Sequence, residues 1–216
     1  MTDKDLKQTV QNALDWDPSI DSSDIGVSAD EGVVTLRGNV KTYAEKYAAE
    51  RVSLRVFGVK AVANDLSVHL PTIFERTDTE IAQAAVTALK SNIVVPSSRI
   101  TVTVSDGWIT LKGSVEWQYQ KDAASRCVRD LFGVKGVSNT IAVEPRVKPT
   151  EVRDKIEAAF KRSAEVDARR INVNASDGKV ILSGNVRSYA ERQEAERAAW
   201  AAPGVTQVED RLAIVP

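Results

Sequence analysis

A thiol and an imidazole could begin nucleophilic or metal chemistry, and each occurs once in this sequence. Cys127 is the only cysteine and His69 the only histidine among the 216 residues. A thiolate–imidazole pair needs both groups within hydrogen-bond reach, and a structural zinc site needs four ligands. Because the two residues stand in different segments of the chain, we expect neither a catalytic pair nor a metal site. A single cysteine also forms no internal disulfide, and Cys127 is expected to be a small core residue.

The densest group of carboxylates is the stretch "DWDPSIDSSD", residues 15–24. A glycoside hydrolase needs two carboxylates that converge on one bond. A calcium loop needs oxygen ligands at regular spacing, with a glycine and a terminal glutamate. This stretch has the acids without either pattern. We interpret it as a solvated loop with Asx turns, and loose cation binding is the alternative.

Three glycine-flanked stretches could be mistaken for phosphate-binding loops. They are "GVVTLRGNV" at 32–40, "GWITLKGSV" at 107–115 and "GKVILSGNV" at 178–186. A P-loop places its glycines between a strand and a helix and continues with Lys-Ser/Thr, so that backbone N–H groups surround the phosphate. Here the residues between the glycines alternate as a strand does. The glycines are therefore interpreted as structural, and no cofactor is predicted.

The same stretches give the period of an internal repeat. Offsets of 75 and then 71 residues relate the glycines, and they also relate Leu6 to Ile81 and Val152. A constant register over the whole unit indicates tandem duplication. We expect units at 1–71, 77–145 and 150–216. The linkers "PTIFERT" and "PRVKPT" contain proline and should act as stiff spacers.

Each unit is predicted to have the order helix, strand, strand, helix, strand. In unit one the inward positions of the first helix and hairpin are Leu6, Val10, Leu14, Ile25, Val27, Val34 and Leu36. The second helix should bury Ala44, Ala48, Val52 and Val56, and the third strand Val62, Leu66 and Val68. These patterns favour an α+β fold of three tandem αββαβ units, each a three-stranded mixed sheet with two helices on one face.

Nine glycines are assigned structural roles. A glycine after an acidic residue forms the hairpin turn, at Gly32, Gly107 and Gly178. A second set should end the second strand, at Gly38, Gly113 and Gly184. A third set should cap the second helix in the left-handed conformation, at Gly58, Gly133 and Gly204.

These residues resemble the BON domain family, named for bacterial osmotic-stress and nodulation proteins. The resemblance lies in "GVVTLRGNV", followed by a helix and "GVKAVANDLSV", and it covers nearly the whole chain. The Asn or Asp position of the last segment is filled by Asn64, Asn139 and Asp210. The resemblance implies a non-enzymatic domain associated with phospholipid membranes, envelope integrity and stress, often in the bacterial periplasm.

The chain ends and the charge distribution suggest a compartment and exclude one class of partner. The opening "MTDKDLKQTV" lacks the apolar segment of a secretory signal, so a cytoplasmic location is expected, or a periplasmic one if a leader has been removed. The net charge is −1. Unit one is acidic and units two and three are slightly basic, so nucleic acid is not an expected partner, although the opposite charges could favour homo-oligomers.

Six residues are candidates for contact with a membrane or a partner. The densest basic region consists of Lys161, Arg162, Arg169 and Arg170. Trp108 should lie on the sheet face away from the helices, and Trp117 should be exposed near the start of the second helix of unit two. Tyr119 takes an inward alanine position and should be core, and Trp16 should pack against the first helix.

The sequence therefore predicts a stress-associated protein that works by binding, with no enzymatic activity. Its expected partners are proteins or the anionic phospholipid surface of a membrane. The alternative is a small-ligand or cation-binding protein that uses grooves between units, with the acidic unit one as the cation site.

Overall fold

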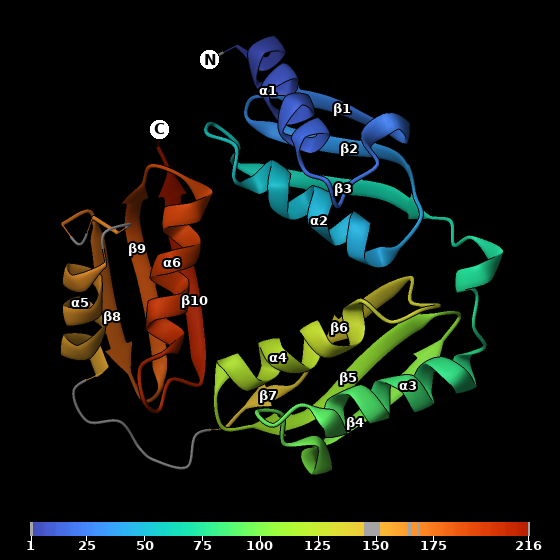
Figure 1. Ribbon diagram of the computed structural model, residues 1–216. Coiled ribbons are helices and arrows are strands. Elements are labelled where there is room, and N and C mark those ends of the chain that lie inside the picture. The colour runs from blue at the N-terminus through green and yellow to red at the C-terminus, as the bar shows by residue number, and fades with distance from the viewer. Residues whose placement is uncertain (1, 145–151, 164–165, 168, 216) are drawn as a thin grey trace. The chain divides into compact units, whose positions relative to one another are not determined.

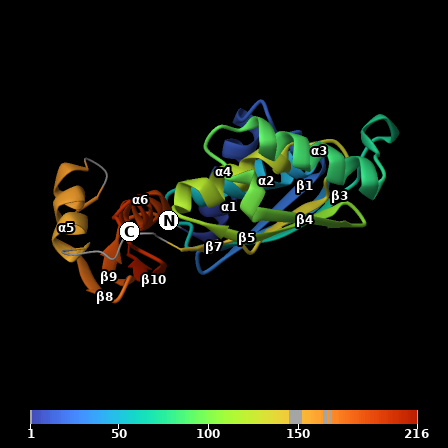
Figure 2. The same ribbon diagram turned by 90° about the horizontal axis from the view of Figure 1, so that it is seen from below.

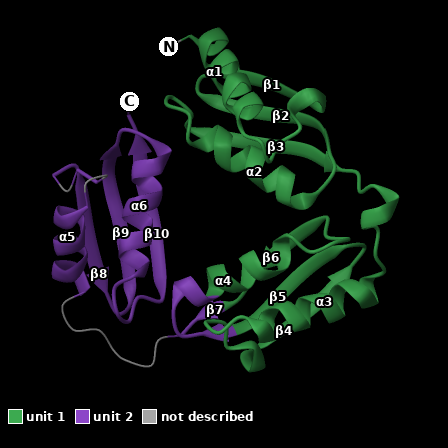
Figure 3. Ribbon diagram, viewed as in Figure 1, with its two compact units in different colours: residues 1–113, 121–141 green, residues 114–120, 142–216 purple. Residues whose placement is uncertain are grey.

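A computed structural model describes residues 2–144, 152–163, 166–167 and 169–215. The chain divides into two compact units, one formed by residues 1–113 and 121–141 and the other by 114–120 and 142–216 (Figure 3). The first contains repeat one and most of repeat two, and the second contains the rest of repeat two and repeat three. The predicted linker "PRVKPT" and the predicted start of unit three at residue 150 lie outside the described residues.

Repeat one has the predicted order of elements (Figure 1). These are α1 (Asp3–Trp16), β1 (Ile25–Asp30), β2 (Val33–Val40), α2 (Tyr43–Leu54) and β3 (Ala61–Val68). The side chain of Thr2 caps α1 and Asp5 completes a capping box, which satisfies N–H groups that a helix start leaves without partners. A short 3-10 turn, Ser22–Asp24, leads into β1.

Repeats two and three follow the same order. Repeat two contains α3 (Asp78–Ser91), β4 (Ile100–Ser105), β5 (Trp108–Val115), α4 (Gln118–Arg129), β6 (Gly136–Asn139) and β7 (Ala142–Val143). Repeat three contains α5 (Val152–Arg162), β8 (Ile171–Ser176), β9 (Lys179–Val186), α6 (Tyr189–Trp200) and β10 (Gln207–Ile214). The third strand of repeat two is divided at Thr140, whose N–H and hydroxyl both donate to the carbonyl oxygen of Leu111.

Each sheet is mixed because its central strand has two kinds of neighbour. In repeat one β2 pairs antiparallel with β1 and parallel with β3, and repeat three has the equivalent order β8-β9-β10. The parallel pair is joined by the crossover helix, as such pairs require. Figures 1 and 2 show the two helices of a repeat on one face of its sheet. The predicted α+β fold of three tandem αββαβ units is confirmed.

The core of each repeat lies between its two helices and its sheet. Leu6, Val10, Leu14, Val34 and Leu36 are all buried in repeat one, as the periodicity predicts. Full burial of an aliphatic side chain contributes roughly 1.5–3 kcal/mol. The core of repeat three uses the equivalent positions with other residue types, and Phe160 is its largest buried side chain.

The buried stripe of the second helix differs from the prediction by one residue. Glu45, Ala49 and Ser53 are buried, whereas the predicted stripe from Ala44 to Val56 is only partly buried. The reason is the carboxylate of Glu45, which accepts N–H bonds from Asp21 and Lys41 at 2.7 and 2.8 Å. Buried polar groups are hydrogen-bonded, so this carboxylate can face inward together with its two N–H donors. A pattern of apolar residues gives no sign of such a buried glutamate.

Two of the glycine assignments need correction. The second helix ends at Leu54 with Arg55 as its C-cap. Gly58 lies in a separate turn, in which the N–H of Val59 donates to the carbonyl of Val56 at 3.2 Å. Its φ of 92° suits a turn position that favours glycine.

Gly38 does not end the second strand, because β2 continues to Val40. Its φ is 128°, and a Cβ atom there would overlap the carbonyl oxygen of Asp24 on the neighbouring segment. The glycine therefore permits a close backbone approach at the start of β1. In the hairpin, Glu31 and Gly32 both have positive φ, 48° and 85°, which is the conformation of a type I′ turn.

Candidate functional site

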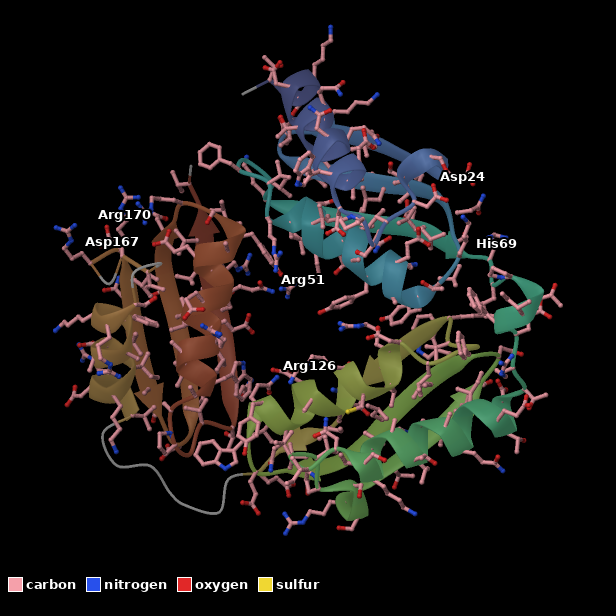
Figure 4. The ribbon with its side chains drawn as sticks, in the orientation of Figure 1. Asp24, Arg51, His69, Arg126, Asp167 and Arg170 are labelled. Carbon is pink, nitrogen blue, oxygen red and sulfur yellow. The ribbon has the colours of Figure 1, made fainter. Side chains whose placement is uncertain are left out.

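Four basic side chains gather at one end of repeat three. Lys161 and Arg162 end α5, and Arg169 and Arg170 directly precede β8. All four are exposed, and Figure 4 shows Arg170 beside Asp167 at this end of the repeat. The structure thus brings together the two basic pairs that the sequence analysis had grouped.

One carboxylate partly neutralises this basic end. The guanidinium groups of Arg169 and Arg170 lie 3.3 and 3.8 Å from the carboxylate of Asp167. The backbone N–H of Arg169, its side chain and the two positive charges lower the pKa of Asp167, so this carboxyl is ionised at neutral pH. Among the residues that the structure describes, neither Lys161 nor Arg162 has an ion-pair partner.

A groove of about 520 Å³ runs between α5 and the edge of the sheet at β8. Its charged lining is Arg153, Glu157, Lys161 and Arg169, and its polar lining is Asn172, Asn174 and Ser183. The buried ring of Phe160 forms part of the wall. Arg153 pairs with Glu157 at 2.8 Å.

Sequence reasoning missed Arg153 and the two asparagines. The signal was present, because Arg153, Glu157 and Lys161 are four residues apart and so share one face of a helix. Arg162 and Arg170 do not line the groove.

Trp108 lies on the sheet face opposite the helices, because its neighbour Ile109 is buried on the helix side. The Trp108 side chain is about half exposed, and its indole Nε1 donates to the hydroxyl of Ser138 at 2.9 Å. The equivalent residue in repeat one is the exposed Val33. In repeat three it is Lys179, which pairs with Glu209 at 2.6 Å. The three copies therefore present different chemistry at one position.

The family model for the BON domain matches residues 2–69, 77–145 and 149–216 of the sequence. The chain belongs to the BON domain family. The match covers all three repeats, as the resemblance implied.

Two curated relatives carry similar sequences. The chain is 33% identical over 147 residues to osmotically-inducible protein Y of Escherichia coli K12, covering 65% of this chain and 72% of that protein. It is 29% identical over 96 residues to outer membrane lipoprotein DolP of Haemophilus influenzae, covering 42% of this chain and half of the lipoprotein.

Among solved structures, two from Chlamydia trachomatis are similar. One is CdsD, a structural protein of the type III secretion system, at 15% identity and a TM-score of 0.27, covering 98% of this chain and 93% of that one. The other is the C-terminal domain of CdsD, at 14% identity and the same TM-score. Scores this low support no argument about this chain.

The Asn or Asp of the BON segment ties the third strand to the second helix. The amide of Asn64 donates to the carbonyl of Lys46 at 3.2 Å, and that of Asn139 donates to the carbonyl of Lys121 at 2.8 Å. In repeat three Asp210 instead accepts from the guanidinium of Arg192 at 2.5 Å. This position of the BON domain therefore has a structural role in all three copies.

Trp117 stands where the other BON repeats have a helix cap. Thr42 and Ser188 cap α2 and α6 with their hydroxyl groups, and Trp117 takes the equivalent position before α4. Its backbone N–H is satisfied by the side-chain oxygen of Gln120 at 3.1 Å. Trp117 is half-buried.

Two aromatic residues of the BON repeats differ from expectation. Tyr119 is 53% exposed and is not a core residue, because the stripe that α4 buries passes through Ala123, Ala124 and Val128 instead. Trp16 is 89% exposed, so it does not pack against the first helix. The apolar pattern assigned Tyr119 to the wrong environment because a one-residue shift turns a helical position by about 100°, whereas Trp16 is the last residue of α1.

The acidic segment of the first BON repeat uses its carboxylates locally. Asp21 pairs with Lys41 at 2.6 Å, and that hydrogen bond is the main cause that lowers the pKa of Asp21 to about 2. Asp15 and Asp17 accept hydrogen bonds from the hydroxyls of Ser22 and Ser19. Within the described part of the chain, no group of three or more acidic, histidine or cysteine side chains could hold a metal ion.

Cys127 and His69 lie in different environments. Cys127 is partly buried in α4, where the amide of Asn92 donates to its sulfur at 3.1 Å. His69 is exposed just after β3 (Figure 4). Among the hydrogen bonds of the described residues, none joins the Cys127 thiol to the His69 imidazole.

Proposed function

We propose that this BON protein works by binding rather than by catalysis, and that the basic end of repeat three contacts anionic phospholipid headgroups. The observation that supports this most directly is the exposure of Lys161, Arg162, Arg169 and Arg170 at one end of the repeat, with Asp167 among them. A basic side chain near an anionic membrane surface contributes about 1 kcal/mol. Such a contact is weak and reversible, and strong binding requires a second attachment.

One relative favours an envelope membrane as the site of this contact, because it is an outer membrane lipoprotein. The other is an osmotically inducible protein. The cytoplasmic location expected from the sequence gains no support from them. Of the helices in the described residues, none is long and apolar enough to cross a membrane.

Protein partners remain part of the proposal, and homo-oligomers stay a prediction. The alternative of a cation site in repeat one is less well supported, because Asp15, Asp17 and Asp21 are already engaged by hydroxyls and Lys41. A pull-down from the source organism under osmotic stress would identify protein partners.

Vesicle flotation tests the lipid contact. The full chain is mixed with vesicles of phosphatidylcholine alone or with one third phosphatidylglycerol, and glutamine replaces all four basic residues in one variant. We expect binding to the anionic vesicles only, weakened at least about tenfold in the variant, since 1.4 kcal/mol corresponds to a factor of ten.

The control replaces Lys90 and Arg99 with glutamine. These two residues of repeat two are equivalent to Lys161 and Arg170. This control should bind as the unchanged protein does. Equal binding to both kinds of vesicle, or equal loss in the control, would count against the basic end of repeat three as the contact.

A further inference from the structure

The edge strand of repeat three carries backbone groups without a strand partner. β8 lies at the end of the order β10-β9-β8, and among the described residues no strand pairs with its other side. The N–H of Asn185 donates to the carbonyl of Arg170 at 3.1 Å, which makes these two residues a hydrogen-bonded pair. Because such pairs alternate along an antiparallel ladder, the peptide groups of Ile171, Val173 and Ala175 point away from β9.

The groove described above lies along this edge. Ile171 and Val173 line it, while their side chains belong to the core, so the groups they direct to the groove are their peptide N–H and C=O. The face of α5 that carries Arg153 and Lys161 forms one wall, and Asn172 and Asn174 extend from the strand on the other side. An added strand would lie about 4.8 Å from β8, between these walls.

The charge of the groove limits what can enter it. Its lining has three cations and one carboxylate, Glu157, which is already paired with Arg153. Lys161 has no ion-pair partner among the described residues. An exposed sheet edge accepts a strand readily, and here acidic side chains on the incoming strand would face Lys161 and Arg169, of which Arg169 is also paired with Asp167.

The other two repeats do not share this charge. In the order of Arg153, Glu157, Lys161 and Arg169, repeat one has Lys7, Gln11, Asp15 and Ser23, and repeat two has Ala82, Val86, Lys90 and Ser98. The basic groove is therefore particular to repeat three. If the basic side chains served only to protect an exposed sheet edge from unwanted pairing, the edge strands of all three repeats would be expected to carry them.

We propose that this groove binds an extended, acidic segment of a partner protein, which adds to the sheet as a strand beside β8. Hydrogen bonds to Ile171, Val173 and Ala175 would supply affinity, as they do when other proteins extend a sheet with a peptide. The basic side chains would supply selectivity. The proposal does not depend on the lipid contact, because a lipid headgroup needs no peptide groups of β8.

A synthetic peptide tests the proposal with the full chain. The probe is a fluorescein-labelled ten-residue peptide of alternating glutamate and threonine, and the comparison peptide carries lysine in place of glutamate. Fluorescence anisotropy measures binding, and amide hydrogen exchange by NMR locates it. We expect only the acidic peptide to bind, with slower exchange at Ile171, Val173 and Ala175. Equal binding of the lysine peptide, or protection in β1 instead, would overturn the proposal.

Two pairs of variants separate the contribution of the β8 backbone from that of the basic side chains. Ala175→Pro removes an N–H that makes no bond to β9, and Ala29→Pro is the matched change in repeat one. We expect Ala175→Pro to weaken acidic-peptide binding at least about fivefold and Ala29→Pro to leave it unchanged. Circular dichroism shows that each variant is folded.

Lys161→Glu should weaken acidic-peptide binding about tenfold, since it replaces an attraction with a repulsion. Arg162→Glu, one residue further and outside the groove, should not. Both changes should weaken binding to anionic vesicles, so loss of vesicle binding in both with intact peptide binding would support only the lipid contact. Unchanged peptide binding in both Ala175→Pro and Lys161→Glu would refute strand addition at β8.

Discussion

The ring of Trp108 fills the space that a side chain at Gly136 would occupy. The two residues are direct neighbours in the parallel ladder of β5 and β6, and a Cβ atom at position 136 would overlap the indole ring. The hydrogen bond from the indole to Ser138 fixes the ring in this place. The exposed aromatic surface of repeat two thus depends on a glycine in the next strand.

We expect Gly136→Ala to displace the ring of Trp108 and to break its bond to Ser138. An ordinary glycine-to-alanine change inside a strand gains about 0.5–1 kcal/mol. Here that gain should be cancelled, because loss of the hydrogen bond costs about 1 kcal/mol. Urea unfolding measures the stability, and the NMR signal of the Trp108 indole N–H reports the ring. A more stable variant with an unmoved indole signal would contradict this account.

Gly38→Ala should destabilise repeat one by about 3 kcal/mol, the upper range for overpacking. The added methyl group would meet the carbonyl of Asp24, which belongs to the backbone and cannot turn aside. Gly26→Ala is the control, since its Cβ would lie 3.6 Å from the carbonyl of Arg37, an ordinary contact. Thermal and urea unfolding of both variants give the comparison. Similar losses in the two would argue against the close approach at Gly38.

Glu191 should tolerate glutamine better than alanine. Its carboxylate accepts N–H bonds from Asp167 at 2.9 Å and Arg187 at 2.7 Å. Repeat two shows that one amide oxygen can serve part of this role, because Oε1 of Gln120 accepts from Glu116 and Trp117, and the residue equivalent to Asp167 there is Pro96, which has no N–H to satisfy. Alanine leaves two donors without partners, which costs about 1–3 kcal/mol for each buried group. Glu191→Gln keeps an acceptor for one of the two donors and Glu191→Ala keeps neither, so we expect the alanine variant to lose more stability in urea unfolding.

The stability of Glu191→Gln should also depend on pH in a way that differs from the unchanged chain. Burial raises the pKa of Glu191, but the N–H groups of Arg187 and Asp167 and the Arg187 guanidinium lower it more, and the net pKa lies below its ordinary value of 4.5. A lowered folded-state pKa gives stability that is present above pH 4.5 and is lost as the pH falls through the folded-state pKa. Glu191→Gln should therefore lose less stability between pH 6 and 3 than the unchanged chain. A steeper loss in the variant would be inconsistent with this sign.

Trp117→Thr should stabilise repeat two. Threonine would restore the cap that Thr42 provides in α2, and an N-cap contributes about 0.5–2 kcal/mol. The midpoint of unfolding of Trp117→Thr should lie above that of a variant that removes the ring without adding a cap. Trp117→Ala is the control, since it removes the ring without adding a cap. If Trp117→Thr is no more stable than Trp117→Ala, capping is not the missing interaction.

Much of the fold could be predicted because its signals are local. Residues such as Leu6, Val10 and Leu14 repeat at the period of a helix, and Glu31-Gly32 marks a hairpin by its turn chemistry. The candidate groove was only half predicted. Lys161 and Arg169 were singled out for their charge, whereas Asn172 and Asn174 have no distinguishing pattern in a strand. The predicted unit boundaries and contact residues stay predictions.

The sequence by itself determined the three-fold repeat, the order of elements and the inward positions of the first helix and central strand, because each follows from spacing along a short segment. Only the tertiary structure decided the roles of Glu45, Gly38 and Gly136. Each of these depends on an approach between segments that are distant along the chain, such as Glu45 to Asp21 or Gly136 to Trp108. Apolar periodicity records which face is buried, and it carries no information about which backbone groups that face must satisfy or how closely a neighbouring strand passes.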